Sequence, residues 1–145
     1  MKKMILLACT VLMAVGLFAK APAVTEKVLA VFNQTFVGAE DVMWSNSKHI
    51  YMVKFTHQGI RTTVKYDADG NFLSSLRYYT AERLPLDIQV KLRKEYTHKN
   101  IFVVTEYVIG DNVNYYVKLE DELSWITVKT DNSREMEVTE NYKKL

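Results

Sequence analysis

Five residues of this chain, TVKYD at 63–67, return almost unchanged as TVKTD at 127–131, 64 positions later. The same shift places the alternating run 51–55 on 115–119. It also places Val24, Val28 and Phe32 on Ile88, Leu92 and Tyr96. One shift without gaps relates three separate blocks, so we interpret the sequence as a duplicated unit of about 60 residues.

Each unit begins with apolar residues spaced as on one face of a helix. In the first unit Val28, Phe32 and Phe36 recur every four residues, and in the second Leu84 and Ile88 begin the same pattern. Pro85 suits a first helical turn, where its missing N–H has no partner to lose. The sequence therefore predicts one helix at the start of each unit.

Runs of alternating apolar and polar residues follow each predicted helix and indicate strands. Residues 42–44 are predicted as a further strand, because the shift places them inside an alternating run of the second unit. The predicted strands are 51–55, 60–66 and 72–76 in the first unit, and 101–109, 115–119, 124–130 and 135–139 in the second.

The predicted fold class is α+β. The units span 24–80 and 84–145, and each consists of a helix followed by an antiparallel β-meander of three or four strands. Neither unit can bury a large core alone. We therefore expect a single domain, 24–145, in which both units share one antiparallel sheet with the helices on one face.

Residues 1–23 have the layout of a signal peptide: Lys2 and Lys3, an apolar stretch at 4–18, and a small-x-small pattern ending at Ala23. Cleavage after Ala19 and an uncleaved anchor are the alternatives. A lipoprotein site at Cys9 is rejected, because the apolar stretch continues past it. The expected location is the periplasm or the outside of the cell, with no stable membrane insertion after cleavage.

Cleavage after Ala23 changes what the composition implies. It removes Cys9, the only cysteine, and with it any disulfide or thiolate chemistry. It also takes three lysines from the 19 basic residues, which leaves 16 against 17 acidic ones. A nearly neutral domain has no general attraction for nucleic acid or anionic membranes, so nucleic acid is not an expected partner.

No group of residues in the sequence predicts a reaction. The run Asp67-Ala68-Asp69-Gly70 is typical of a turn and lacks the further ligands of a calcium loop. His49, His57 and His98 have no zinc-ligand spacing, and Ser74-Ser75 has no neighbouring base. We expect no enzyme, no cofactor and no metal.

Alternation predicts which strand residues point away from the helices. That face would show Met52 and Thr63 in the first unit, Thr127 in the second, and an unusual set of basic and aromatic residues. Such a set is typical of protein interfaces, so the expected partner is a protein or peptide with an acidic surface. The candidate binding residues are Trp125, Tyr116, Lys54, Arg61, Lys65, Lys118 and Lys129.

Alternatives to this binding face stay open. Lys129 can pair with Glu135 or Glu137 across a turn, and the segment 138–145 can cover Trp125. A carrier of a small molecule or ion is a second hypothesis, with a pocket between sheet and helices lined by tyrosines. A hydrolase that uses the histidines is a third.

The order of these motifs resembles the PepSY-like family, β-lactamase-inhibitor-like exported bacterial proteins. The resemblance covers the chain after the signal peptide and is carried by Val42, Trp44, Tyr51, Val53, Phe55, the run Tyr66–Gly70, Leu84-Pro85 and Tyr115–Val117. It implies a two-repeat inhibitor-type fold whose open sheet face binds a protein. This chain departs from the disulfide-linked inhibitors in having no cysteine after residue 9, and 131–134 lacks the D-x-D-G form. Inhibition of a β-lactamase therefore does not follow from the resemblance.

Overall fold

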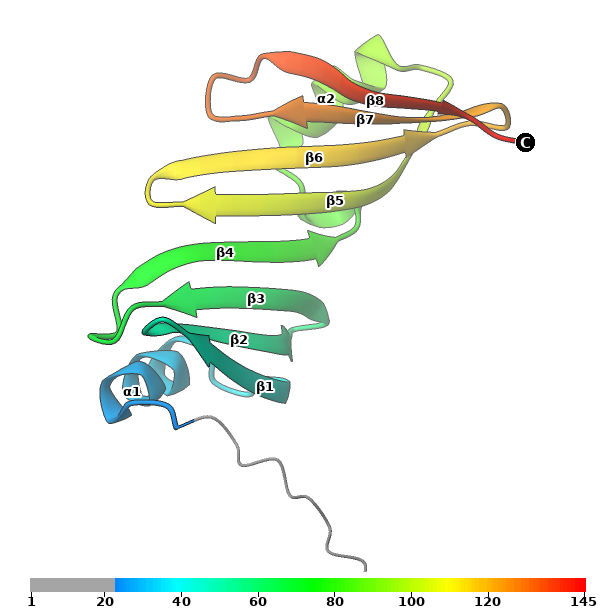
Figure 1. Cartoon of the computed structure of the whole chain (residues 1–145). Coiled ribbons are helices and arrows are strands. Elements are labelled where there is room, and N and C mark those ends of the chain that lie inside the picture. Colours follow the sequence, from blue (N-terminus) through cyan, green and yellow to red (C-terminus); the bar gives the residue numbers. More distant parts are fainter. Residues whose placement is uncertain (1–22) are drawn as a thin grey trace, which may run out of the picture.

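The computed structural model describes residues 23–145, so the predicted signal peptide falls almost entirely outside the described residues. The described chain forms two α-helices, one 3-10 turn and eight strands (Figure 1). The first half contains α1 (Glu26–Thr35), β1 (Glu40–Ser47), β2 (Ile50–His57), β3 (Ile60–Tyr66) and β4 (Phe72–Tyr79). The second contains η1 (Ala81–Arg83), α2 (Leu86–Glu95), β5 (Asn100–Ile109), β6 (Asn112–Glu120), β7 (Ser124–Thr130) and β8 (Met136–Lys143).

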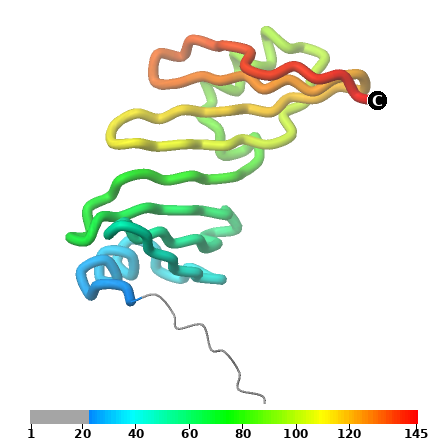
Figure 2. The backbone as a smooth tube through the Cα atoms, viewed as in Figure 1, coloured from blue at the N-terminus to red at the C-terminus, as the bar shows by residue number. Residues whose placement is uncertain are grey.

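The eight strands form one antiparallel sheet, and each pairs with the next in sequence order from β1 to β8. Figure 2 shows the chain winding from one edge of the sheet to the other, with η1 and α2 inserted between β4 and β5. The prediction of an α+β chain with one antiparallel sheet is confirmed. Residues 42–44, predicted as a strand, lie within β1. None of the helices in the described part is long and apolar enough to cross a membrane.

The uniform shift of 64 residues is wrong for the helices and for the first strand of each half. Both helices end in the same way, with the backbone N–H of Phe36 bonded to Phe32 O and that of Tyr96 to Leu92 O. These positions differ by 60. The counterpart of the buried Ile88 is therefore Val28, not Val24.

The difference between a shift of 64 and a shift of 60 arises in the β5–β6 hairpin. Trp44 pairs with Val53 on the neighbouring strand, and Val104 pairs with Val117 in the same way. The first pair is nine positions apart along the chain and the second is thirteen, so the β5–β6 arm is four residues longer. A shift of 64 therefore holds only after this hairpin.

The first hydrophobic cluster packs α1 against β2 and β3. Val28 and Phe32 of α1 are buried on Val53, Phe55 and Val64. The Phe32 ring meets Phe55 edge-on with centroids 5.1 Å apart, and such a contact adds about 0.5–1.5 kcal/mol beyond area burial. This aromatic packing takes the place of a larger core.

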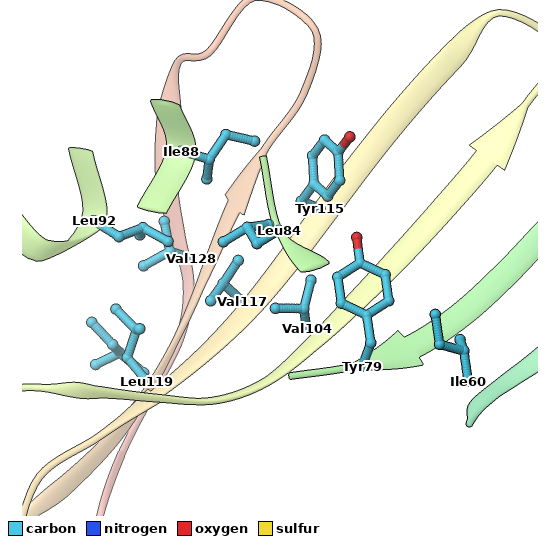
Figure 3. Packing of buried hydrophobic residues seen from close by; sticks show 11 residues of the cluster. Ile60, Tyr79, Leu84, Ile88, Leu92, Val104, Tyr115, Val117, Leu119 and Val128 are labelled. Atoms are coloured by element: carbon cyan, nitrogen blue, oxygen red, sulfur yellow. The ribbon is translucent and has the colours of Figure 1, made fainter. Parts of the chain in front are cut away.

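The second cluster packs α2 against the later strands (Figure 3). Ile88 and Leu92 lie on Val104, Val117 and Val128, all nearly inaccessible to solvent. In Figure 3 the Leu84 and Ile88 side chains point toward the strands from one side. Within α2, the four-residue spacing of Ile88 and Leu92 gives the helix one apolar face, while Leu86 and Val90 point to solvent.

The β3–β4 turn holds the beginning of α1 in place. Thr25 caps the helix by accepting a bond from Val28 N and donates to Ala68 O at 3.3 Å. In the turn, the Asp67 carboxylate accepts from the backbone N–H of Asp69 and Asn71, each at 2.9 Å. The bond from the Asn71 side chain, together with these backbone bonds, holds the pKa of Asp67 below its usual range. The carboxylate thus stabilises the turn.

Candidate functional site

Cross-strand register assigns each side chain to one of two faces. Val53 pairs with Val64 and Val64 with Ser75, while Tyr79 pairs with Val104. Ser75 and Tyr79 are four residues apart on β4 and so share a face. This is the core face, which carries both hydrophobic clusters. The opposite side is called the open face.

A single row of paired residues crosses the open face through all eight strands. Neighbours in the row face each other directly, and adjacent strands lie about 4.8 Å apart. Arg61 and Lys129 are four strands apart in it, a separation of about 19 Å. The row consists of Glu40, Thr56, Arg61, Tyr78, Thr105, Tyr116, Lys129 and Glu137.

All seven residues predicted for binding belong to the open face by register. Arg61, Tyr116 and Lys129 lie in the row itself, and Lys54 and Lys118 lie beside it, paired with Thr63 and Thr127. Lys65 lies further along β3, paired with Met52 and Ser74. Trp125 lies at the far end of β7, paired with Glu120 and Tyr142.

The basic side chains of this face have no acidic partner within residues 23–145. The five ion pairs of this part of the chain are formed by other lysines and arginines. Lys129 stands opposite Glu137, but no ion pair or side-chain hydrogen bond joins them. Lys54, Arg61 and Lys65 are exposed. Their charge is therefore available to another molecule.

Two depressions hollow the open face. One, of about 450 Å³, includes Lys54, Arg61 and Tyr78 in its lining. The other, of about 500 Å³, includes Thr105, Tyr116, Lys118 and the β8 residue Glu140. Tyr78, 43% exposed, lines the first depression and pairs with Thr105, which lines the second. The two depressions therefore follow one another along the row, and we call the pair of them the trough.

A corner cluster of Phe102, Trp125 and Tyr142 adjoins the second depression. The β5 register shifts between Ile101 and Val103, and this bulge leaves Phe102 unpaired. Its ring meets Trp125 edge-on at 4.9 Å between centroids. Trp125 is half-buried, with Lys144 Nζ 4.4 Å from its ring centre, whereas Phe102 and Tyr142 are more than half exposed. Sequence reasoning missed Phe102, because alternation does not reveal a bulge.

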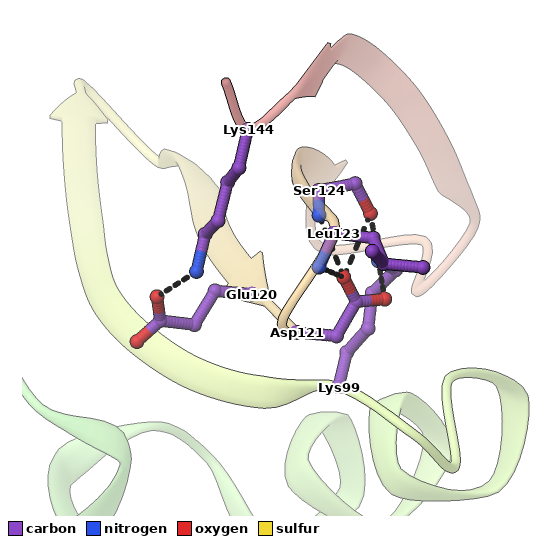
Figure 4. Close-up of polar contacts among 6 residues, drawn as sticks. All are labelled: Lys99, Glu120, Asp121, Leu123, Ser124 and Lys144. Carbon is purple, nitrogen blue, oxygen red and sulfur yellow. Dashed lines mark hydrogen bonds and ion pairs between the residues drawn. The ribbon is translucent and has the colours of Figure 1, made fainter.

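Lys144 and Lys99 anchor the loops next to this corner (Figure 4). Lys144 Nζ lies 2.8 Å from Glu120 Oε2. Lys99 donates to Asp121 Oδ2 at 2.5 Å and to Ser124 Oγ at 2.6 Å. Asp121 Oδ1 also accepts from the backbone N–H of Leu123 and Ser124. The donors of Lys99, Leu123 and Ser124 are thus directed at Asp121 or Ser124 and close the β6–β7 turn, while Lys144 holds Glu120 at the end of β6.

The tyrosine-lined pocket between sheet and helices does not match the structure. Tyr51, Tyr66, Tyr79 and Tyr115 are buried in the two clusters. Burial raises the pKa of the Tyr66 hydroxyl to about 12. The cleft present on the core face has no tyrosine in its lining. Within residues 23–145, no three His, Cys, Asp or Glu side chains lie close enough together to hold a metal ion.

Comparisons by sequence give no relative: no family model matches the chain, and no curated protein matches it. Comparison with solved structures finds proteins of similar fold. A protein from Bacteroides eggerthii provisionally described as periplasmic is 14% identical, with a TM-score of 0.59 over 84% of this chain and 90% of that one. A DUF2874 family protein from Bacteroides uniformis is 16% identical, with a TM-score of 0.58 over 83% and 90%.

A third solved structure is a BLIP-like protein from Bacteroides fragilis, 12% identical, with a TM-score of 0.60 over 84% of this chain and 87% of that one. The fold is therefore similar to that of BLIP-like (β-lactamase-inhibitor-protein-like) proteins. At these identities the likeness concerns the fold. The inhibitor-like part of the predicted resemblance agrees with it, and the PepSY-like name stays a prediction.

Proposed function

We propose that this protein is an exported, non-enzymatic binding module that captures an acidic protein segment on its open face. Binding there would inhibit or regulate an envelope or secreted protein by covering part of its surface. The two halves are taken as copies of one unit, each with its helix on the core face, which leaves the opposite face uncovered. The periplasmic description of one similar structure and the predicted signal peptide support the location.

The observation that carries the proposal is the uncompensated charge around the trough. Lys54, Arg61 and Lys118 line it, and Lys65 lies further along β3. None of the four forms an ion pair in the described part of the chain, although Asp41 and Glu140 also line the trough. Exposed charges of one sign accelerate encounters with an oppositely charged partner and contribute less to the final affinity. The basic residues would therefore govern the association rate and its salt dependence.

Affinity is expected to come from the aromatic side chains. Tyr78 and Tyr116 lie in the row, and the corner cluster adds Phe102 and Tyr142. Truncation of an aromatic residue at a binding hot spot costs about 2 kcal/mol or more. A partner segment of about six extended residues would span the 19 Å between Arg61 and Lys129.

Affinity capture from the envelope fraction of the source cell tests this proposal. The bait variants are Tyr116→Ala and Lys54→Gln/Arg61→Gln, each compared with the parent protein. The matched control is Arg93→Gln/Lys94→Gln, which removes the same two charges from exposed positions on α2. Trp125→Ala is a less direct test, because it also removes the packing with Phe102.

We expect one protein to be retained by the parent and by the α2 control, and to be lost from both open-face variants. Circular dichroism checks that all baits are folded. A protein retained equally by every bait would place its binding elsewhere on the molecule and contradict the proposal.

A further inference from the structure

A second hollow lies on the core face, in the gap between the two hydrophobic clusters. It has a volume of about 460 Å³, within the range of small-molecule sites. Its floor is formed by the central strands β3, β4 and β5, and Phe36 at the end of α1 forms one wall. This helix-side cleft is separate from the trough on the open face, so it can serve a different ligand.

The floor of the cleft contains an ion pair between β4 and β5, in a row where the flanking strands have Thr62 and Tyr115. Arg77 Nη1 donates to Glu106 Oε1 at 3.1 Å, and the Tyr79 hydroxyl donates to Glu106 Oε2 at 2.6 Å. Glu106 is thereby engaged at both oxygens, with its side chain only 13% exposed. Arg77 is more accessible, at 37%. Since a guanidinium has five N–H donors, Arg77 keeps donors for a ligand.

A second guanidinium lies at the rim. Arg83 Nη2 donates to the backbone oxygen of Gln58, a residue of the cleft lining. His57, which precedes Gln58 in the chain, also lines the cleft, and its Nε2 lies 3.2 Å from Val37 O. Within the lining the charges of Arg77 and Glu106 balance, and Arg83 adds a positive charge beside the cleft through its contact with Gln58. Arginine suits carboxylate recognition, because its planar fork matches the two oxygens.

Most of the remaining lining is apolar or aromatic, with Thr62 and Ser75 as its polar members. Phe36 and Phe72 stand on the walls, and Val64 and Val108 form part of the floor beside Arg77. Phe72 is 45% exposed although it lies on the core face, so its ring is accessible to a ligand in the cleft. An apolar surface with a few convergent polar donors is the usual composition of a ligand site.

We propose that the helix-side cleft binds a small amphipathic carboxylate, such as a medium-chain fatty acid or an aromatic acid. Arg77 holds the carboxylate while Glu106 and Tyr79 fix the guanidinium in place. The hydrocarbon part lies between Phe36 and Phe72. This activity goes beyond the proposed capture of a protein and does not depend on it.

Decanoate is the probe, and its binding to the purified protein is measured by isothermal titration calorimetry. Decanol, which has the same chain without the charge, is measured by displacement of the fluorescent dye anilinonaphthalene sulfonate. We expect saturable decanoate binding, at least 10-fold weaker for Arg77→Gln. Decanol should displace the dye at least 10-fold less effectively than decanoate does.

Two further variants keep the result decisive if Arg77→Gln does not fold. Ser75→Leu fills the floor without removing either partner of the ion pair and should also weaken decanoate at least 10-fold. Arg61→Gln removes a guanidinium from the open face and should bind within 2-fold of the parent. Absence of saturable binding, or equal binding by the parent and Ser75→Leu, overturns the proposal, as does a loss confined to Arg61→Gln.

Discussion

Lys99 Nζ lies 2.5 Å from Asp121 Oδ2 and ties the segment after α2 to the β6–β7 turn. The first half makes the same connection with different chemistry. There His57, at the end of β2, contacts the backbone oxygen of Val37 after α1. In each half, the segment after the helix is thus held against the turn that follows the second strand. The second half uses an ion pair for this contact and the first half uses an imidazole.

This ion pair predicts a specific acid sensitivity. The Lys99 ammonium, with the backbone N–H groups of Leu123 and Ser124, holds the pKa of Asp121 well below its ordinary value of 3.8. A lowered carboxyl pKa stabilises the fold above the unfolded pKa, and that stability is lost as the pH falls through the folded pKa. Asp121→Asn, which keeps the acceptor for the backbone N–H groups, should therefore be less stable than the parent at neutral pH.

The check is urea unfolding of both proteins at about pH 6 and about pH 3, where the difference between them should shrink. Asp111→Asn is the control, because the Asp111 side chain forms no hydrogen bond or ion pair in the described part of the chain. A difference between Asp121→Asn and the parent that stays the same at both pH values would refute the role of the charge.

The position of α2 on the sheet predicts a contrast between two leucines. Leu92 is 1% exposed in the second cluster, whereas Leu86 on the same helix is 74% exposed. Leu92→Ala should lower the free energy of unfolding by about 2–5 kcal/mol, because it leaves a cavity. Leu86→Ala should change it by less than about 0.5 kcal/mol. Chemical denaturation measures both, and similar losses would mean that the helix is rotated about its axis.

Gly70 predicts a backbone effect in the β3–β4 turn. Its φ is +87°, and a Cβ there would lie 3.2 Å from Val31 Cγ2 and 3.3 Å from Lys27 O. Gly110 also has a positive φ, +53°, but open space around it. Gly70→Ala should cost about 1–2 kcal/mol for the left-handed conformation and roughly 1 kcal/mol more for the crowding. Equal thermal or chemical stability of the Gly70→Ala and Gly110→Ala variants would show that α1 does not approach this turn.

Alternation was sufficient to predict most strands and their buried sides. Val53, Phe55, Val64 and Tyr66 were expected to face the helices, and all four are buried with α1. Period-two patterns survive in an antiparallel sheet with one packed face, because a slip of one residue would expose the whole apolar set. The basic residues of the open face could be placed for the same reason.

The errors in the prediction arose where the structure depends on how strands pair, which the periodicity of the sequence does not show. An alternating run looks the same whether a hairpin is four residues longer or not, so the long β5–β6 arm was not detected and the helices were aligned incorrectly. Phe102 was missed because its bulge depends on the partner strand. β8 extends to Lys143, beyond the predicted end at 139, because this charged edge strand has little apolar pattern.

The most direct test of the central proposal is site-specific photo-crosslinking in the living source cell. A photoreactive phenylalanine analogue replaces Tyr116 in the open-face trough, and in a second strain it replaces Val90, which is 59% exposed on α2. The account predicts that position 116 forms an adduct with one cellular protein and that position 90 does not. An adduct formed from position 90 and absent from position 116 would contradict it.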